Sequence, residues 1–265
     1  MKNRVVIEKL SGETPLMALQ KWKHVNPAYA NVPASYAGRL DPMASGKLLV
    51  LLGEECKKQK AYTGLDKEYE IEVLLDVGSD TGDALGLVEY VGRETRPERE
   101  ALRAVLRAEH GAHRRPYPQF SSKAVNGKPL FLHTLEGGIK LINIPEHEEH
   151  IYDIKVRQSV SISSTALAAR IADFLAKVPT SDEPSKALGA DFRINEVRAS
   201  WEKLFATVGE RTFTILSLRV ACGSGTYMRS LAGRIGEALG TRALVLSIRR
   251  TRIGTYWKGW WLKSL

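Results

Sequence analysis

The 265-residue sequence has few cysteines and no long apolar run. Its two cysteines, Cys56 and Cys222, are too few for a disulfide framework. The longest apolar runs, such as Leu48 to Leu52, are far shorter than the roughly 20 residues of a membrane-spanning helix. Residues 1–8 also lack the apolar core of a signal peptide. We therefore expect a cytoplasmic protein with reduced thiols and no membrane segment.

Several motifs that mark common enzyme classes are missing as well. There is no glycine-rich phosphate-binding loop and no nucleophile elbow, which argues against a nucleotide hydrolase, a dehydrogenase and a serine esterase. His147 and His150 are three residues apart, whereas the His-Glu-x-x-His zinc motif needs a spacing of four. Asp80, Asp83 and Gly86 lack the ligand pattern of a calcium loop. We expect no metal and no cofactor.

Positive charge is in excess, and it is concentrated near the end of the chain. The 39 Lys and Arg residues outnumber the 30 Asp and Glu residues, for a net charge of +9. Residues 241–265 contain no acidic residue, three of the five tryptophans, and the basic residues Arg242, Arg249, Arg250, Arg252, Lys258 and Lys263. Cations neutralise phosphates and flat rings stack on bases, so this pattern favours contact with RNA or DNA. The alternative is a terminal strand with core aromatics and solvent-facing arginines.

Apolar periodicity indicates both strands and helices. Alternating apolar residues predict a strand over 68–78, with a partner over 87–91 after a turn. Further strands are expected over 151–156 and 216–222, a hairpin turn at Asn126-Gly127, and helices beginning at Thr14-Pro15, Pro97 and Met228. Residues 158–210 have helical periodicity instead and are interpreted as a helical insertion. Because strands and helices do not alternate strictly, the pattern indicates an α+β fold.

One loop carries an isolated carboxylate between residues that restrict the backbone. Gly38, Pro42 and Gly46 bracket Asp41 immediately before the apolar run at 48–52. Such a loop either presents Asp41 to a cleft or uses it to cap the following turn. The residues alone leave both interpretations open.

The segment Gly38-Arg39-Leu40-Asp41-Pro42-Met43-Ala44-Ser45-Gly46 resembles the catalytic motif of the TruB family of tRNA pseudouridine synthases. Further segments resemble the family in the same order: Lys9 with Gly12 and Thr14, Lys67-Glu68-Tyr69, Phe120-Ser121-Ser122, and Gly223 to Arg229. The resemblance covers most of 1–157 and 211–252. It implies a mixed, mainly antiparallel sheet with flanking helices, in a single catalytic domain over 1–265 that contains the 158–210 insertion. The family's usual C-terminal RNA-binding PUA domain is not expected in this chain.

The resemblance also implies an activity, the isomerisation of a tRNA uridine to pseudouridine, at uridine 55 of the T loop. Asp41 would be the catalytic carboxylate, Arg229 its ionic partner, and Tyr69 a stacking and proton-carrying group. From the residues alone, Tyr69 is equally a core aromatic and Arg229 a solvent-facing helix residue. A monomer acting on the tRNA T arm without metal or cofactor is expected. The RNA-binding residues would be Lys9, Tyr36, Arg39, Lys123, Arg249, Arg250 and Arg252.

Two departures and two alternatives accompany the resemblance. The family usually has His where this chain has Tyr36, and Lys123 stands one place before the family's lysine. Arg39-Leu40-Asp41 also resembles the Arg-Leu-Asp of the rRNA-modifying RluA and RsuA relatives. A non-catalytic RNA-binding protein or RNA chaperone on the same scaffold is the other alternative.

Overall fold

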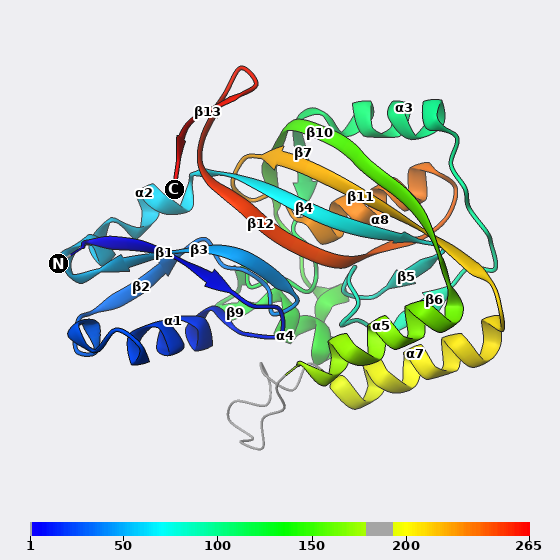
Figure 1. Ribbon diagram of the computed structural model, residues 1–265, viewed down its shortest axis with the longest axis horizontal. Coiled ribbons are helices and arrows are strands. Elements are labelled where there is room, and N and C mark those ends of the chain that lie inside the picture. Colours follow the sequence, from blue (N-terminus) through cyan, green and yellow to red (C-terminus); the bar gives the residue numbers. More distant parts are fainter. Residues whose placement is uncertain (1, 179–192) are drawn as a thin grey trace.

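One large sheet forms the centre of the protein, and helices pack around it (Figure 1). The computed structural model describes residues 2–178 and 193–265. The strands of the sheet are β1 (Arg4–Lys9), β2 (Ala34–Ala37), β3 (Ala44–Leu52), β4 (Asp66–Leu75), β7 (Gly111–Pro116), β10 (Glu146–Ser163), β11 (Thr212–Cys222), β12 (Ala243–Trp257) and β13 (Trp260–Ser264).

Within the described residues these nine strands are ordered β1-β3-β12-β4-β11-β10-β7, with β2 paired to β3 and β13 paired to β12. Among the described strands, β3 and β12 alone run parallel, and the other pairs of this sheet are antiparallel. Two small hairpins lie outside the sheet, β5 (Val77–Ser79) with β6 (Val88–Tyr90), and β8 (Ala124–Val125) with β9 (Lys128–Pro129). This confirms the predicted α+β class and the mainly antiparallel sheet.

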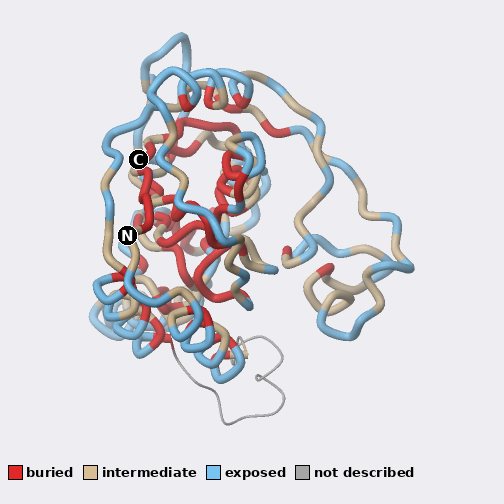
Figure 2. The backbone as a smooth tube through the Cα atoms, turned by 90° about the vertical axis from the view of Figure 1, so that its right-hand side faces the viewer, coloured by how far each residue is buried: buried red, intermediate tan, exposed pale blue. Residues whose placement is uncertain are grey.

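The helices are α1 (Pro15–His24), α2 (Gln59–Thr63), α3 (Arg99–Glu109), α4 (Leu130–Leu135), α5 (Ser164–Ala176), α7 (Ile194–Val208) and α8 (Met228–Ala238), with 3-10 turns η1 (Pro27–Tyr29), η2 (Gly53–Lys58) and η3 (Ile139–Leu141). The helix predicted at Thr14-Pro15 is confirmed, because the Thr14 hydroxyl accepts the Met17 N–H at 3.2 Å as an N-cap. Helix α8 buries Leu231, Ala232 and Ile235 and packs against β12 and β4. Buried residues accordingly gather along the central strands (Figure 2).

The strand predicted over 68–78 is broken at Asp76. Its backbone adopts φ +70°, so β4 ends at Leu75 and β5 begins at Val77. The Asp76 side chain is fully buried and accepts hydrogen bonds from the Thr95 N–H and the Thr241 hydroxyl, each at 2.7 Å. A buried carboxylate needs such donors, and reaching them interrupts the strand.

The insertion predicted over 158–210 begins later than expected. Residues 158–163 continue β10, which pairs with β11 as far as Ser163 and Thr212. The Ser163 hydroxyl accepts the Ala166 N–H at 3.2 Å and so caps α5. Helices α5 and α7 then lie side by side within the predicted range (Figure 1). Residues 179–192, which include the linker between them, lie outside the described residues. No helix in the described part of the chain is long and apolar enough to cross a membrane.

Trp201 joins the α5–α7 helix pair to the sheet core. Its side chain is 2% exposed, and its indole N–H donates to the Ala84 carbonyl at 3.1 Å. Trp201→Ala removes this buried ring and leaves the carbonyl without its donor. We expect the free energy of unfolding to fall by about 3–5 kcal/mol, measured by urea denaturation. Leu141→Ala, at a 91% exposed site, should change it by less than about 0.5 kcal/mol. Equal unfolding midpoints for the two variants would contradict this assignment.

Candidate active site

Asp41 lies in the connection between β2 and β3, beside a cavity of about 220 Å³. Its side chain is 47% exposed, so a ligand in the cavity can reach the carboxylate. The loop is fixed to the N-terminal segment by the Gly12 N–H, which donates to the Pro42 carbonyl at 2.9 Å. The Ser11 hydroxyl donates to the Met43 carbonyl at 3.0 Å. The backbone on either side of the carboxylate is therefore held in one position.

Lys9 holds the same loop from within. Its ammonium is fully buried and donates to the carbonyls of Leu10 at 3.0 Å, of Pro42 at 3.3 Å and of Ala44. Burial lowers the pKa of Lys9 to about 8. Because the ammonium is enclosed by main-chain carbonyls, the structure corrects the expectation of an RNA contact at Lys9.

Arg250 holds the loop from the other side, from strand β12. It is 1% exposed and donates to the carbonyls of Lys47 at 2.7 Å and Gly38 at 3.0 Å. Gly46, at φ +103°, lies against the Arg250 backbone, where a Cβ atom would come within 2.3 Å of its carbonyl oxygen. Arg250 also lines the cavity, and the hydrogen bonds of its guanidinium bind it to main-chain carbonyls of the protein.

Arg229, in the first turn of α8, provides the ionic partner of Asp41. Its Nε lies 2.9 Å from Asp41 Oδ2, although its side chain is only 6% exposed. The two other guanidinium nitrogens donate to the carbonyls of Thr81 at 2.8 Å and Phe120 at 2.9 Å. The guanidinium is thus held in place, with Nε at ion-pair distance from the Asp41 carboxylate.

A second carboxylate, Asp83, lies on the buried side of Arg229. Its Oδ2 is 3.6 Å from Arg229 Nε, and burial raises the pKa of Asp83 in spite of the nearby guanidinium. Burial by itself would lower the pKa of Arg229, but Asp41 and Asp83 raise it above its ordinary value. Arg229 is therefore a permanent positive charge between an accessible and a buried carboxylate. Asp83 was not predicted as a site residue, and the turn sequence gave no signal that its side chain faces Arg229.

Two residues on one face of β4 complete the cavity wall. Tyr69 and Lys67, two positions apart, both line it, as side chains i and i+2 of a strand do. Burial raises the pKa of Tyr69, so its phenol keeps its proton. Lys67 Nζ donates to the Thr63 carbonyl at 2.7 Å, and burial lowers the pKa of Lys67 to about 8. Lys67 was missed as a site residue, although its strand position relative to Tyr69 was a usable signal.

The remaining predicted site residues lie in three different places. Arg39 lines the cavity, while Lys123, Arg249 and Arg252 are exposed on the surface. Tyr36 is not brought to the cavity. It packs against a separate apolar cluster formed by β1, α1 and β3, with the buried residues Ile7, Ala18, Leu19, Leu48, Val50 and Leu52. In the described residues, no three His, Cys, Asp or Glu side chains are grouped so that they could hold a metal ion.

Comparison with known proteins gives consistent matches. The family model described as "TruB family pseudouridylate synthase (N terminal domain)" matches residues 28–171. A protein named tRNA pseudouridine synthase B from Azoarcus sp. (strain BH72) is 30% identical over 252 residues, covering 95% of this chain and 65% of that protein. The protein of the same name from Deinococcus radiodurans is 30% identical over 221 residues, covering 83% of this chain and 65% of its own length. The chain thus spans somewhat less than two thirds of each relative.

Among solved structures, a chain of a Cbf5-Nop10-Gar1 complex superposes with a TM-score of 0.53 at 19% identity. The match covers 94% of this chain and 48% of that chain. At this level of identity the likeness concerns the fold.

The lowered pKa of Lys67 makes stability depend on pH. Between about pH 8 and 10.5 the unfolded chain keeps a proton on Lys67 that the folded protein has released. The contribution of Lys67 to the free energy of unfolding therefore rises with pH across this range, by up to about 1.4 kcal/mol per pH unit. Lys67→Met removes this contribution, so its free energy of unfolding should rise less steeply over this range. Urea denaturation at a series of pH values measures the slope. Lys60→Met, at an exposed site, should keep the wild-type slope, and an unchanged slope in Lys67→Met would contradict the burial argument.

Proposed function

The chain belongs to the TruB family of pseudouridylate synthases, and on this premise we propose that it converts a uridine of tRNA to pseudouridine, with Asp41 as the catalytic carboxylate. The observation that carries the proposal is the Asp41–Arg229 ion pair, 2.9 Å long, beside a cavity that Tyr69 also lines. Both carboxylate and guanidinium lie in the segments whose sequences resemble the family's motifs.

The reaction is an isomerisation that needs few groups. The bond between C1′ and N1 of uridine breaks, the base turns, and a new bond joins C1′ to C5. C5 then loses its proton, and N1, which carries no proton in uridine, gains one, so the product has the composition of the substrate. An ionised carboxylate beside the ribose serves this reaction, either by attacking C1′ or by assisting elimination to a glycal. Asp41 is the exposed carboxylate of the cavity and fits either route.

Arg229 and Tyr69 have separate supporting roles. The fixed guanidinium pairs with the Asp41 carboxylate and sets the position of its oxygens. The Tyr69 ring provides a flat wall for the uracil. Because its phenol remains protonated, it is able to donate a hydrogen bond or pass a proton while the base turns.

A base inside a folded RNA arm must leave its stack before it can enter such a cavity. This costs roughly a few kcal/mol, which contacts to the backbone and stacking in the pocket offset. Arg39 at the cavity, together with Lys123, Arg249 and Arg252 on the surface, would provide the phosphate contacts. The expected target is uridine 55 in the T arm, and tRNA would be encountered in the cytoplasm.

The choice of tRNA over ribosomal RNA is supported by the names of the relatives, both tRNA pseudouridine synthase B. Incubation of the purified protein with unmodified tRNA and with unmodified ribosomal RNA, followed by mapping of pseudouridine, tests it. We expect modification of tRNA at one T-loop position. Modification of ribosomal RNA alone would favour the RluA and RsuA type of activity, and RNA binding without any pseudouridine would favour a chaperone.

Asp41→Asn keeps the size of the side chain but removes the negative charge. We expect release of tritium from C5-labelled uridine in a T-arm stem-loop to fall by at least about 10³-fold, because the carboxylate takes part in the chemical step. Binding of the same RNA, followed by fluorescence anisotropy, should remain within about threefold, since one neutralised side chain removes no phosphate contact.

Asp173→Asn is the matched control, because Asp173 is 69% exposed on α5 and pairs with Lys177 outside the cavity. It should turn over at the wild-type rate. Turnover retained by Asp41→Asn would refute the assignment.

A further inference from the structure

The C-terminal strands β12 and β13 form a hairpin that projects beyond the sheet (Figure 1). Its two-residue turn, Lys258-Gly259, has φ +46° and +92°, the positive values of the hairpin turn that matches strand twist. Trp257 lies opposite Trp260, and Tyr256 lies opposite Trp261. Residues directly opposite each other share one face of a hairpin, and successive residues alternate. The four aromatic residues are thus divided between two faces.

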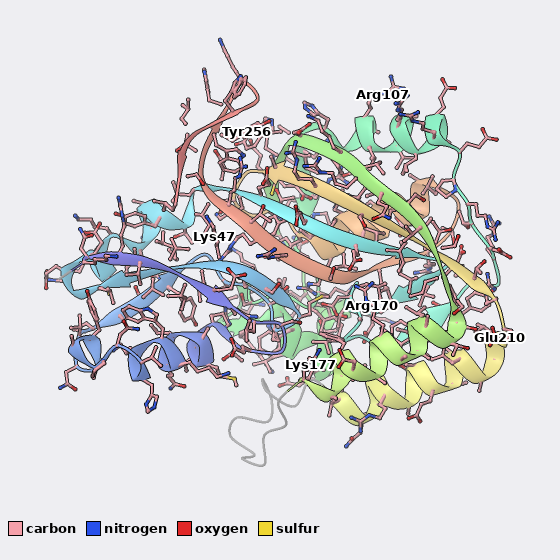
Figure 3. All side chains as sticks on the ribbon, viewed as in Figure 1. Lys47, Arg107, Arg170, Lys177, Glu210 and Tyr256 are labelled. Atoms are coloured by element: carbon pink, nitrogen blue, oxygen red, sulfur yellow. The ribbon has the colours of Figure 1, made fainter. Side chains whose placement is uncertain are left out.

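The inner face of the hairpin carries Tyr256 and Trp261, and it contacts the rest of the protein. The ring of Tyr256 stacks on Tyr152 with centroids 5.4 Å apart and meets the edge of Trp261 at 5.3 Å. The Tyr256 N–H donates to Asp66 Oδ2 at 2.8 Å, and the Tyr152 hydroxyl donates to Asp66 Oδ1 at 3.0 Å. Figure 3 shows Tyr256 at the root of the hairpin, beside the sheet. These contacts anchor the hairpin to the body of the protein.

The outer face of the hairpin carries Trp257 and Trp260, and it is open to solvent. Trp257 is 59% exposed and Trp260 is 76% exposed, so two indoles at the tip of one hairpin face solvent. The neighbouring Lys258 ammonium lies 5.6 Å from the centroid of the Trp257 ring. Paired exposed aromatic rings next to a cation are typical of surfaces on which unpaired bases stack while their phosphates are neutralised.

The hairpin is also close to the catalytic cavity along the sheet. Asp66, which anchors Tyr256, is the residue before Lys67 of the cavity wall. Strand β12 itself passes through the wall at Ile248 and Arg250 before it reaches the hairpin. An RNA that enters the cavity therefore has the hairpin within reach.

We propose that Trp257 and Trp260 form a stacking platform for unpaired bases of the RNA substrate, outside the catalytic cavity. That this RNA is the substrate rests on the proposed function. Charge favours RNA over a second copy of the chain, because residues 241–265 contain no acid and each copy carries a net charge of +9. The platform adds affinity for the substrate and takes no part in the chemical step.

The test measures binding without turnover, in an Asp41→Asn background, with a fluorescein-labelled tRNA transcript. Replacing both tryptophans with Ala should weaken binding by at least about tenfold, since each base–aromatic stack is worth severalfold in affinity. Replacing both with Phe keeps flat rings and should stay within about threefold of the parent. Leu262→Ala is the matched control, because Leu262 is an equally exposed apolar side chain of the same hairpin, at 63%, that cannot stack. Its affinity should be unchanged.

Two further readouts separate stacking from other effects. Addition of the transcript should quench tryptophan emission in the parent and much less in the double Ala variant. The slope of log Kd against log salt should be equal in both, because no cation has been removed. The proposal is overturned if the double Ala variant binds like the parent, if Leu262→Ala loses as much affinity, or if the tryptophans prove by sedimentation to hold a dimer together. Absence of pseudouridine formation by the wild-type protein, with tryptophan-dependent RNA binding intact, would overturn the proposed function alone.

Discussion

The contact between Arg229 and Asp41 is the interaction on which the site depends. The guanidinium has its donors in a rigid plane, so the carbonyls of Thr81 and Phe120 fix where Nε points. Three segments far apart in the sequence, the Asp41 loop, the turn after β5 and the connection after β7, therefore meet at one buried cation on α8. A flexible ammonium in its place would not define the position of the carboxylate in the same way.

Buried cations also explain why the loop is rigid although its carboxylate is exposed. Lys9 and Arg250 bind main-chain carbonyls on its two sides, and Gly46 allows the backbones of β3 and β12 to approach closely. Burial of Lys9 is unfavourable for its charge, as its lowered pKa shows. The folded protein carries this unfavourable contribution at the place where Lys9 fixes the loop that contains Asp41. The basic residues are consequently of two kinds. Some, such as Lys9 and Arg250, are buried and hold the loop, whereas others lie on the surface.

The fold was largely predictable because its elements carry strong local patterns. The Thr14 cap, the alternation in β4 and the apolar face of α8 were all read correctly from neighbouring residues. The break at Asp76 was not, because its cause is hydrogen bonding to Thr95 and Thr241, remote in the chain. Burial of Lys9 and Arg250 was missed for the same reason. A basic residue looks alike in sequence whether its partner is a phosphate or a carbonyl of a distant loop, and only the packing of β1 and β12 around that loop decides between them.

If Asp41 is the catalytic carboxylate, we expect Arg229 to act by orienting it and not by binding RNA. The most direct measurement is the single-turnover rate of pseudouridine formation by Arg229→Lys, together with its affinity for the same T-arm RNA. The positive charge is kept, but one ammonium cannot reproduce the planar set of contacts, so the carboxylate is misplaced. We expect a rate lower by about 10²-fold or more with an affinity within about threefold of wild type. A wild-type rate, or a loss confined to affinity, would contradict it.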